Sequence, residues 1–64
     1  MPITDEIRRR REKAGLTQEQ AADRAGMHQP AWAKIELGVV ANPTIDTLRR
    51  MADALGCSVG VLLK

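Results

Sequence analysis

Hydrophobic residues recur along this chain at the spacing of helices, and the alternation typical of strands is almost absent. The clearest stripe lies within residues 44–56, where apolar positions repeat about every helical turn. We expect it to face a core, and it consists of Ile45, Leu48, Met51, Ala52 and Leu55. Glycines and capping residues divide the remaining pattern into short segments. The pattern therefore predicts an all-α, compact bundle of five helices.

Capping residues indicate where the first two helices begin. Thr4 is the expected cap of the first, because acidic residues follow it where the helix dipole favours them. Thr17 to Gln20 reads T-x-x-Q, a capping box. It starts a second, alanine-rich helix over about residues 17–25.

The third helix covers about residues 28–37, beginning at His28 or Gln29. Pro30 falls in its first turn, where the missing N–H has no intrahelical partner to lose. We expect the other first-turn amides to be free. The link between the second and third helices is too short for antiparallel packing, so they should cross steeply, as in a helix-turn-helix pair.

The two sides of the third helix differ in character. Trp32 and Ile35 fall on one side and are expected in the core. The opposite side is small and polar and suits a groove about 12 Å wide, the width of the DNA major groove. It consists of Pro30, Ala33, Lys34 and Leu37, with Gln29 at its amino-terminal flank.

Two further helices complete the chain. Thr44 caps the fourth, and Ser58 starts a short fifth whose Val59, Leu62 and Leu63 should face inward.

Length and composition limit the classes of protein. The 64 residues suit one domain, residues 1–64, and no run approaches the ~20 apolar residues of a membrane span. One cysteine excludes an internal disulfide, and with one histidine it makes a poor metal site. We expect no metal, no cofactor and no membrane partner. The polar start lacks a signal peptide, which predicts a cytoplasmic, soluble protein.

The charges are unevenly distributed. The formal net charge is +2, but residues 8–13 contain five positive charges against one negative. Such a run is typical of binding to nucleic acid or to an anionic membrane, and a solvated helix face is the alternative. No nucleophile is paired with an acid–base group, so an enzyme is not expected.

Ordered motifs now show a family resemblance. "LTQEQAADRAGMHQPAWAKIELG", followed by "NPTIDTLRRMADALGCSV", resembles the phage-repressor/Cro-type helix-turn-helix transcription regulators from about Ile7 to Leu63. The likeness implies a lambda-repressor-like fold and binding to double-stranded DNA. "HQPAWAKIELG" is also similar to helices of antitoxins from toxin–antitoxin pairs.

The resemblance implies residue roles. Gln29 matches the leading base-contacting position, where an amide can pair with adenine. Lys34 matches a second such position, and Ala31 and Ala33 could contact thymine methyl groups. The implied base contacts are Gln29, Pro30, Ala31, Ala33 and Lys34. The implied or expected phosphate contacts are Arg10, Thr17, Gln18, His28 and Asn42. Arg11 and Glu36 match a structural ion pair, and the expected core includes Trp32, Ile35, Leu48 and Leu55.

Two departures from the family pattern matter. Trp32 stands where the family has Ile or Val, and the small Ala21 and Ala25 stand where it has larger aliphatics, so the core volume is kept. The "VVA" loop of residues 39–41 has no Lys or Arg for phosphate, which suggests a protein contact instead. We therefore expect a homodimeric DNA-binding transcription regulator that acts as a repressor; the alternative is an antitoxin that binds a protein toxin and represses its own operon.

Overall fold

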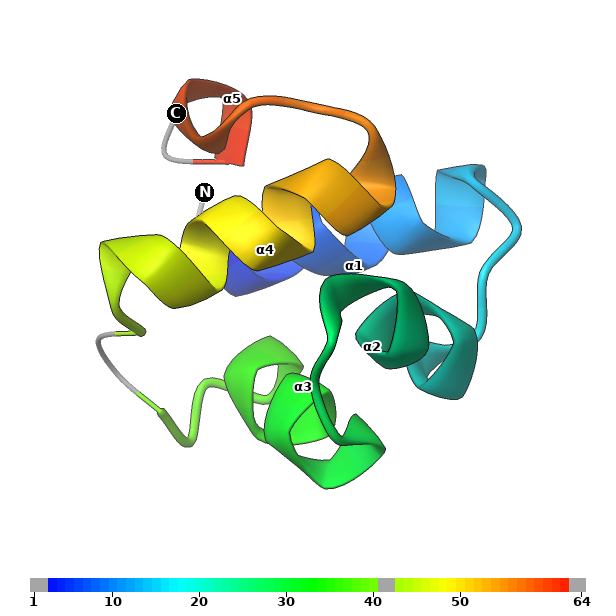
Figure 1. Cartoon of the computed structure of the whole chain (residues 1–64), viewed down its shortest axis with the longest axis vertical. Coiled ribbons are helices and arrows are strands. Elements are labelled where there is room, and N and C mark those ends of the chain that lie inside the picture. Colours follow the sequence, from blue (N-terminus) through cyan, green and yellow to red (C-terminus); the bar gives the residue numbers. More distant parts are fainter. Residues whose placement is uncertain (1–2, 41–42, 63–64) are drawn as a thin grey trace.

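A computed structural model describes residues 3–40 and 43–62 of the chain. In these residues the chain forms five helices and no strand. The helices are α1 (Ile3–Lys13), α2 (Gln18–Ala25), α3 (Gln29–Glu36), α4 (Ile45–Leu55) and α5 (Val59–Leu62). Figure 1 shows α1 and α4 across the middle of the molecule, with α5 on one side and α2 and α3 on the other. The all-α fold class is as the sequence predicts.

Local chemistry fixes both ends of α2 and, at its carboxyl end, the turn into α3. Thr17 Oγ1 accepts from the Gln20 N–H at 3.1 Å, and Gln20 Oε1 accepts from the Thr17 N–H at 3.0 Å, which completes the capping box. Gly26 ends α2 with φ of +70°, a left-handed conformation that glycine adopts without a steric penalty. This sharp stop turns the chain so that α3 packs across α2.

The core forms around Trp32, which is fully buried together with Ile7, Met51 and Leu62. Ala21, Ala22 and Ala25 supply the buried face of α2. These short side chains leave room for a large indole, because close packing requires that volumes across an interface add up. Ile35 and Leu48 are buried, and Leu55 is half-buried against the same cluster.

Two sequence-based expectations are wrong at helix ends. Ile3 is already helical, so Thr4 lies inside α1 and is not its cap. Ile45 does not face the core and is 55% exposed. It is the first residue of α4, and a helical side chain points toward the amino terminus, so that of Ile45 extends past the packed part of the helix. Leu63 and Asn42 lie outside the described residues.

Within the described residues, no helix is both long enough and apolar enough to cross a bilayer.

Candidate nucleic-acid interface

The outer face of α3 is open to solvent. Pro30, Ala31 and Lys34 are exposed, and Ala33 and Gln29 are half-exposed. Trp32 and Ile35, on the opposite side of the same helix, are buried. The protein's own packing therefore leaves the predicted DNA-facing side of α3 accessible.

The amino end of α3 differs in part from expectation. His28 occupies the N-cap position, but its side chain makes no capping hydrogen bond. The N–H groups of Ala31 and Trp32 both donate to the His28 carbonyl, at 3.0 and 3.2 Å. The expectation of several free first-turn amides is therefore wrong for these two residues, because the first turn closes on the His28 oxygen.

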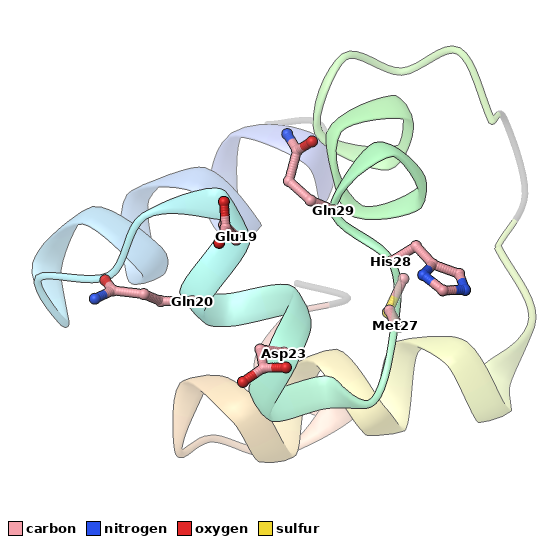
Figure 2. A pocket seen from close by; sticks show the side chains of 6 residues that line it. All are labelled: Glu19, Gln20, Asp23, Met27, His28 and Gln29. Carbon is pink, nitrogen blue, oxygen red and sulfur yellow. The ribbon is translucent and has the colours of Figure 1, made fainter.

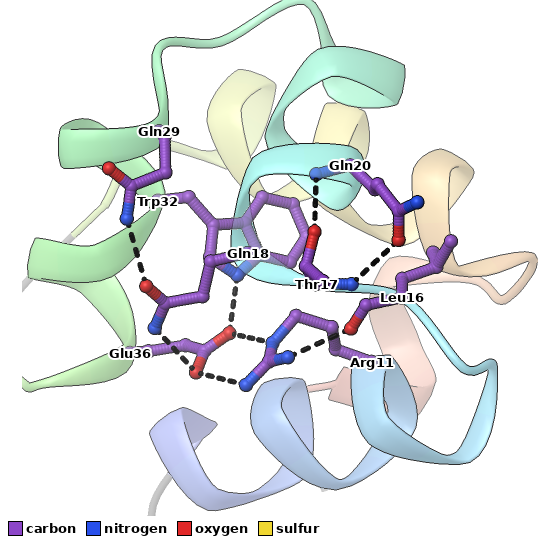
Figure 3. Close-up of polar contacts among 8 residues, drawn as sticks. All are labelled: Arg11, Leu16, Thr17, Gln18, Gln20, Gln29, Trp32 and Glu36. Carbon is purple, nitrogen blue, oxygen red and sulfur yellow. Dashed lines mark hydrogen bonds and ion pairs between the residues drawn. The ribbon is translucent and has the colours of Figure 1, made fainter.

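A chain of side-chain hydrogen bonds runs from the surface into the core (Figure 3). Gln29 Nε2 donates to Gln18 Oε1 at 3.0 Å, and Gln18 Nε2 donates to Glu36 Oε1 at 3.2 Å. Arg11 donates to both carboxylate oxygens of Glu36, from Nε at 2.6 Å and from Nη2 at 3.2 Å. The indole N–H of Trp32 donates to Glu36 Oε2. The fold thus brings together one expected base contact, one expected phosphate contact and the expected ion pair.

Glu36 is the centre of this chain and is nearly inaccessible. Its side chain is 3% exposed and that of Arg11 is 12% exposed. Burial by itself would raise the pKa of Glu36, but the hydrogen bonds from Arg11, Trp32 and Gln18 outweigh it and hold that pKa below its ordinary 4.5. The hydrogen bond to Glu36 in turn raises the pKa of Arg11. Both groups are therefore charged at neutral pH.

The basic run on α1 is largely neutralised by the protein itself. Arg8 lies 3.7 Å from Asp5, Arg9 lies 3.6 Å from Glu6, and Arg10 donates to Glu6 at 2.9 Å. Arg11 is committed to Glu36. Four arginines that look like a cationic patch in the sequence thus each have a carboxylate partner. The pairs of Arg8, Arg9 and Arg10 follow from i, i+3 and i, i+4 spacing on the helix, whereas that of Arg11 joins α1 to α3. Arg10 can contact phosphate only by sharing or leaving Glu6.

An acidic hollow flanks the amino end of α3 (Figure 2). This cavity of about 360 Å³ lies between α2 and the turn and is lined by Glu19, Gln20, Asp23, Met27, His28 and Gln29. The two carboxylates, Glu19 and Asp23, disfavour a phosphate inside the hollow itself, because like charges repel. The four-residue spacing of Glu19 and Asp23 places them on one face of α2, and this spacing is the signal in the sequence for the hollow.

An apolar surface lies at the carboxyl end of α3, in the loop that follows and at the first residue of α4. It consists of Leu37, Val39, Val40 and Ile45, which are 76%, 68%, 39% and 55% exposed. Beside it lies a mainly apolar cavity of about 430 Å³, lined by Met27, Ala31, Lys34, Ile35, Val40, Pro43, Thr44 and Thr47. Lys34 is thus separated from Gln29 and borders this second cavity.

Two short helices that cross at a glycine turn, with the outer side of the second helix exposed, define a helix-turn-helix domain. The family model described as Helix-turn-helix, of the Cro/C1 type, matches residues 7–62, and the chain belongs to this family of DNA-binding transcription regulators. No curated protein matches the chain significantly.

Proposed function

We propose that residues 1–64 form one DNA-binding domain that inserts α3 into the major groove and acts as a cytoplasmic transcriptional repressor. The observation that carries this proposal is the division of α3 into a buried side, around Trp32, and an exposed side of small residues. A helix in the major groove needs such a side, because bulky side chains would hold it away from the base edges.

The polar residues of that side suggest a division of labour. Gln29 contacts a base at the amino end, and Lys34 contacts a base or phosphate one turn later. Pro30, Ala31 and Ala33 make methyl and methylene contacts. Thr17, Gln18, His28, Asn42 and Arg10 contact phosphate, with Arg10 the weakest because of its bond to Glu6.

We further infer a homodimer on a roughly palindromic operator. One domain of this size buries too little DNA for high specificity, and two domains related by a two-fold axis read half-sites about one helical turn apart. Selection of binding sites from random duplexes tests the whole proposal. Enrichment of a two-fold symmetric site supports it, and recovery of no preferred sequence contradicts it.

The exposed apolar surface favours a second candidate function, that of an antitoxin. Leu37, Val39 and Ile45 are unusually exposed for their size, and such surfaces mark protein contacts. A toxin bound there would make repression a second role of the same chain. Co-expression with the product of the adjacent gene tests this: joint purification that Val39→Lys abolishes supports it, and failure to associate contradicts it.

A further inference from the structure

We propose that Glu36 is a positioning residue for base specificity, because through Gln18 it determines the orientation in which the Gln29 amide presents its donor and its acceptor to DNA. This inference rests on the proposed base contact of Gln29 and deepens it. The observation behind it is the order of donors and acceptors along Glu36, Gln18 and Gln29.

The order begins at a group that can only accept. An ionised carboxylate has about four acceptor positions and no donor. Arg11 and Trp32 supply donors to Oε2 of Glu36, and Arg11 and Gln18 supply donors to Oε1. Every acceptor position is therefore occupied, and the carboxylate has no freedom to rotate without losing bonds.

The order is then transmitted through Gln18. Because Glu36 accepts, Gln18 must turn its NH₂ group toward the carboxylate, which places its carbonyl oxygen on the other side. That oxygen in turn accepts only, so Gln29 must offer its NH₂ group, at 3.0 Å. In Figure 3 the Gln29 oxygen points away from Gln18. Gln29 keeps one N–H and its oxygen for a ligand, in a fixed order.

This fixed order distinguishes adenine from guanine. Adenine offers a donor at N6 and an acceptor at N7, which match the free oxygen and free N–H of Gln29. Guanine offers two acceptors, O6 and N7. A mobile amide could turn its NH₂ group toward both, but the Gln29 nitrogen is tied to Gln18. Removing a link of this hydrogen-bonded chain should therefore reduce the preference for adenine over guanine.

Two variants act on different links. Gln18→Met removes the amide and leaves the bonds of Arg11 and Trp32 to Glu36 in place. Glu36→Gln should reverse the order. Arg11 Nε and the Trp32 N–H keep the new amide oxygen at the Oε2 position, so its NH₂ group takes the Oε1 position and faces Gln18, and Arg11 Nη2 loses its acceptor there. Gln18 then turns over, and Gln29 must accept from it and direct its own NH₂ group outward.

The experiment measures dissociation constants for two duplexes: the selected duplex, and one in which guanine replaces adenine at the base position that Gln29→Ala identifies. The ratio of the two constants measures the discrimination between the bases. A bidentate contact discriminates by about 5- to 150-fold. We expect Gln18→Met to lower this ratio at least threefold, Glu36→Gln to lower it further, and the double variant to match Gln18→Met. A ratio cancels any uniform loss of phosphate binding. Gln20→Met is the matched control, since it breaks the capping box of the same helix and should leave the ratio unchanged.

The outcomes separate the two proposals. If Gln29→Ala leaves the selected sequence unchanged, the proposed base contact of Gln29 is wrong. If Gln29→Ala removes the preference for adenine but folded Gln18→Met keeps the full ratio, only the present proposal is overturned. Circular dichroism checks the fold of each variant. An unchanged ratio in folded Glu36→Gln overturns the role of Glu36, and Gln18→Met tests the link from Gln18 to Gln29.

Discussion

The indole N–H of Trp32 donates to the carboxylate of Glu36, one turn further along α3. Trp32 is the largest fully buried side chain, and Glu36 is the buried half of the ion pair with Arg11. The residue that fills the core therefore also satisfies the charge beside it. A buried indole needs an acceptor for its N–H and a buried carboxylate needs donors, so each group reduces the cost of burying the other.

Trp32 should contribute through both its volume and its N–H. We expect Trp32→Ala to lower the free energy of unfolding by about 3–5 kcal/mol, since it leaves a large cavity among alanines. Trp32→Phe keeps much of the volume and should lose about 1.5–3 kcal/mol, the range for a hydrogen bond to a charged group. Urea unfolding followed by circular dichroism measures both. An unaffected Trp32→Phe would show that the N–H contributes nothing, and an unaffected Trp32→Ala would contradict the core role.

Removal of Arg11 should be more damaging than removal of its neighbours on α1. Arg11→Met leaves Glu36 buried without its main partner, which should cost about 3–5 kcal/mol. Arg8→Met is the matched control, because Arg8 is exposed and its pair with Asp5 should contribute about 0–1 kcal/mol. Thermal and urea unfolding of the two variants should differ clearly; similar losses would mean that burial of the Glu36 pair is unimportant.

The fold should lose stability in acid through Glu36. Its pKa is lowered by folding, so its contribution is fully present above the ordinary value of 4.5 and is lost as the pH falls through the lower, folded pKa. Melting temperatures measured from pH 7 downward should therefore decline below about pH 4.5, and the decline should be shallower in Glu36→Gln if that variant folds. A wild-type profile that is flat across this range would contradict the ion pair's role.

Gln29→Ala should relax the preference at one base position and weaken binding to the selected duplex by about 1–3 kcal/mol. Gln29 is half-exposed and its bond to Gln18 is the outermost link of the hydrogen-bonded chain, so the free energy of unfolding should change little. The measurement is binding-site selection with both proteins. A reduced affinity that is equal for all sequences would instead indicate a phosphate contact.

DNA binding should weaken with salt, because neutralising phosphates releases counterions. Lys34 is the exposed cation on the outer face of α3, so Lys34→Ala should reduce the slope of log K against log salt by about 1. Val39→Lys should increase that slope by about 1, since it adds an exposed cation in the loop that follows α3. Titrations between about 50 and 200 mM salt measure these slopes, and Arg8→Met should leave them unchanged.

Local chemistry made most of the fold predictable. The capping box of Thr17 and Gln20, the cap Thr44 and the glycine that ends α2 act within one turn of the chain, so their residues alone specify where helices begin and end. The two errors at helix ends have different causes. Thr4 is not the cap of α1 because Ile3, the residue before it, is already helical, and the exposure of Ile45 depends on which elements cover the start of α4.

The sequence by itself determined the helix order, the turn between α2 and α3, and the division of α3 into an apolar and a small polar side, because caps act locally and helical periodicity converts spacing into faces. Only the tertiary structure decided that Arg11 is paired with Glu36, that Glu19 and Asp23 border the amino end of α3, and that Gln29, Gln18 and Glu36 form one hydrogen-bonded chain. Donor and acceptor order depends on side chains from separate helices meeting at bonding distance, and that proximity exists only after the core around Trp32 has packed.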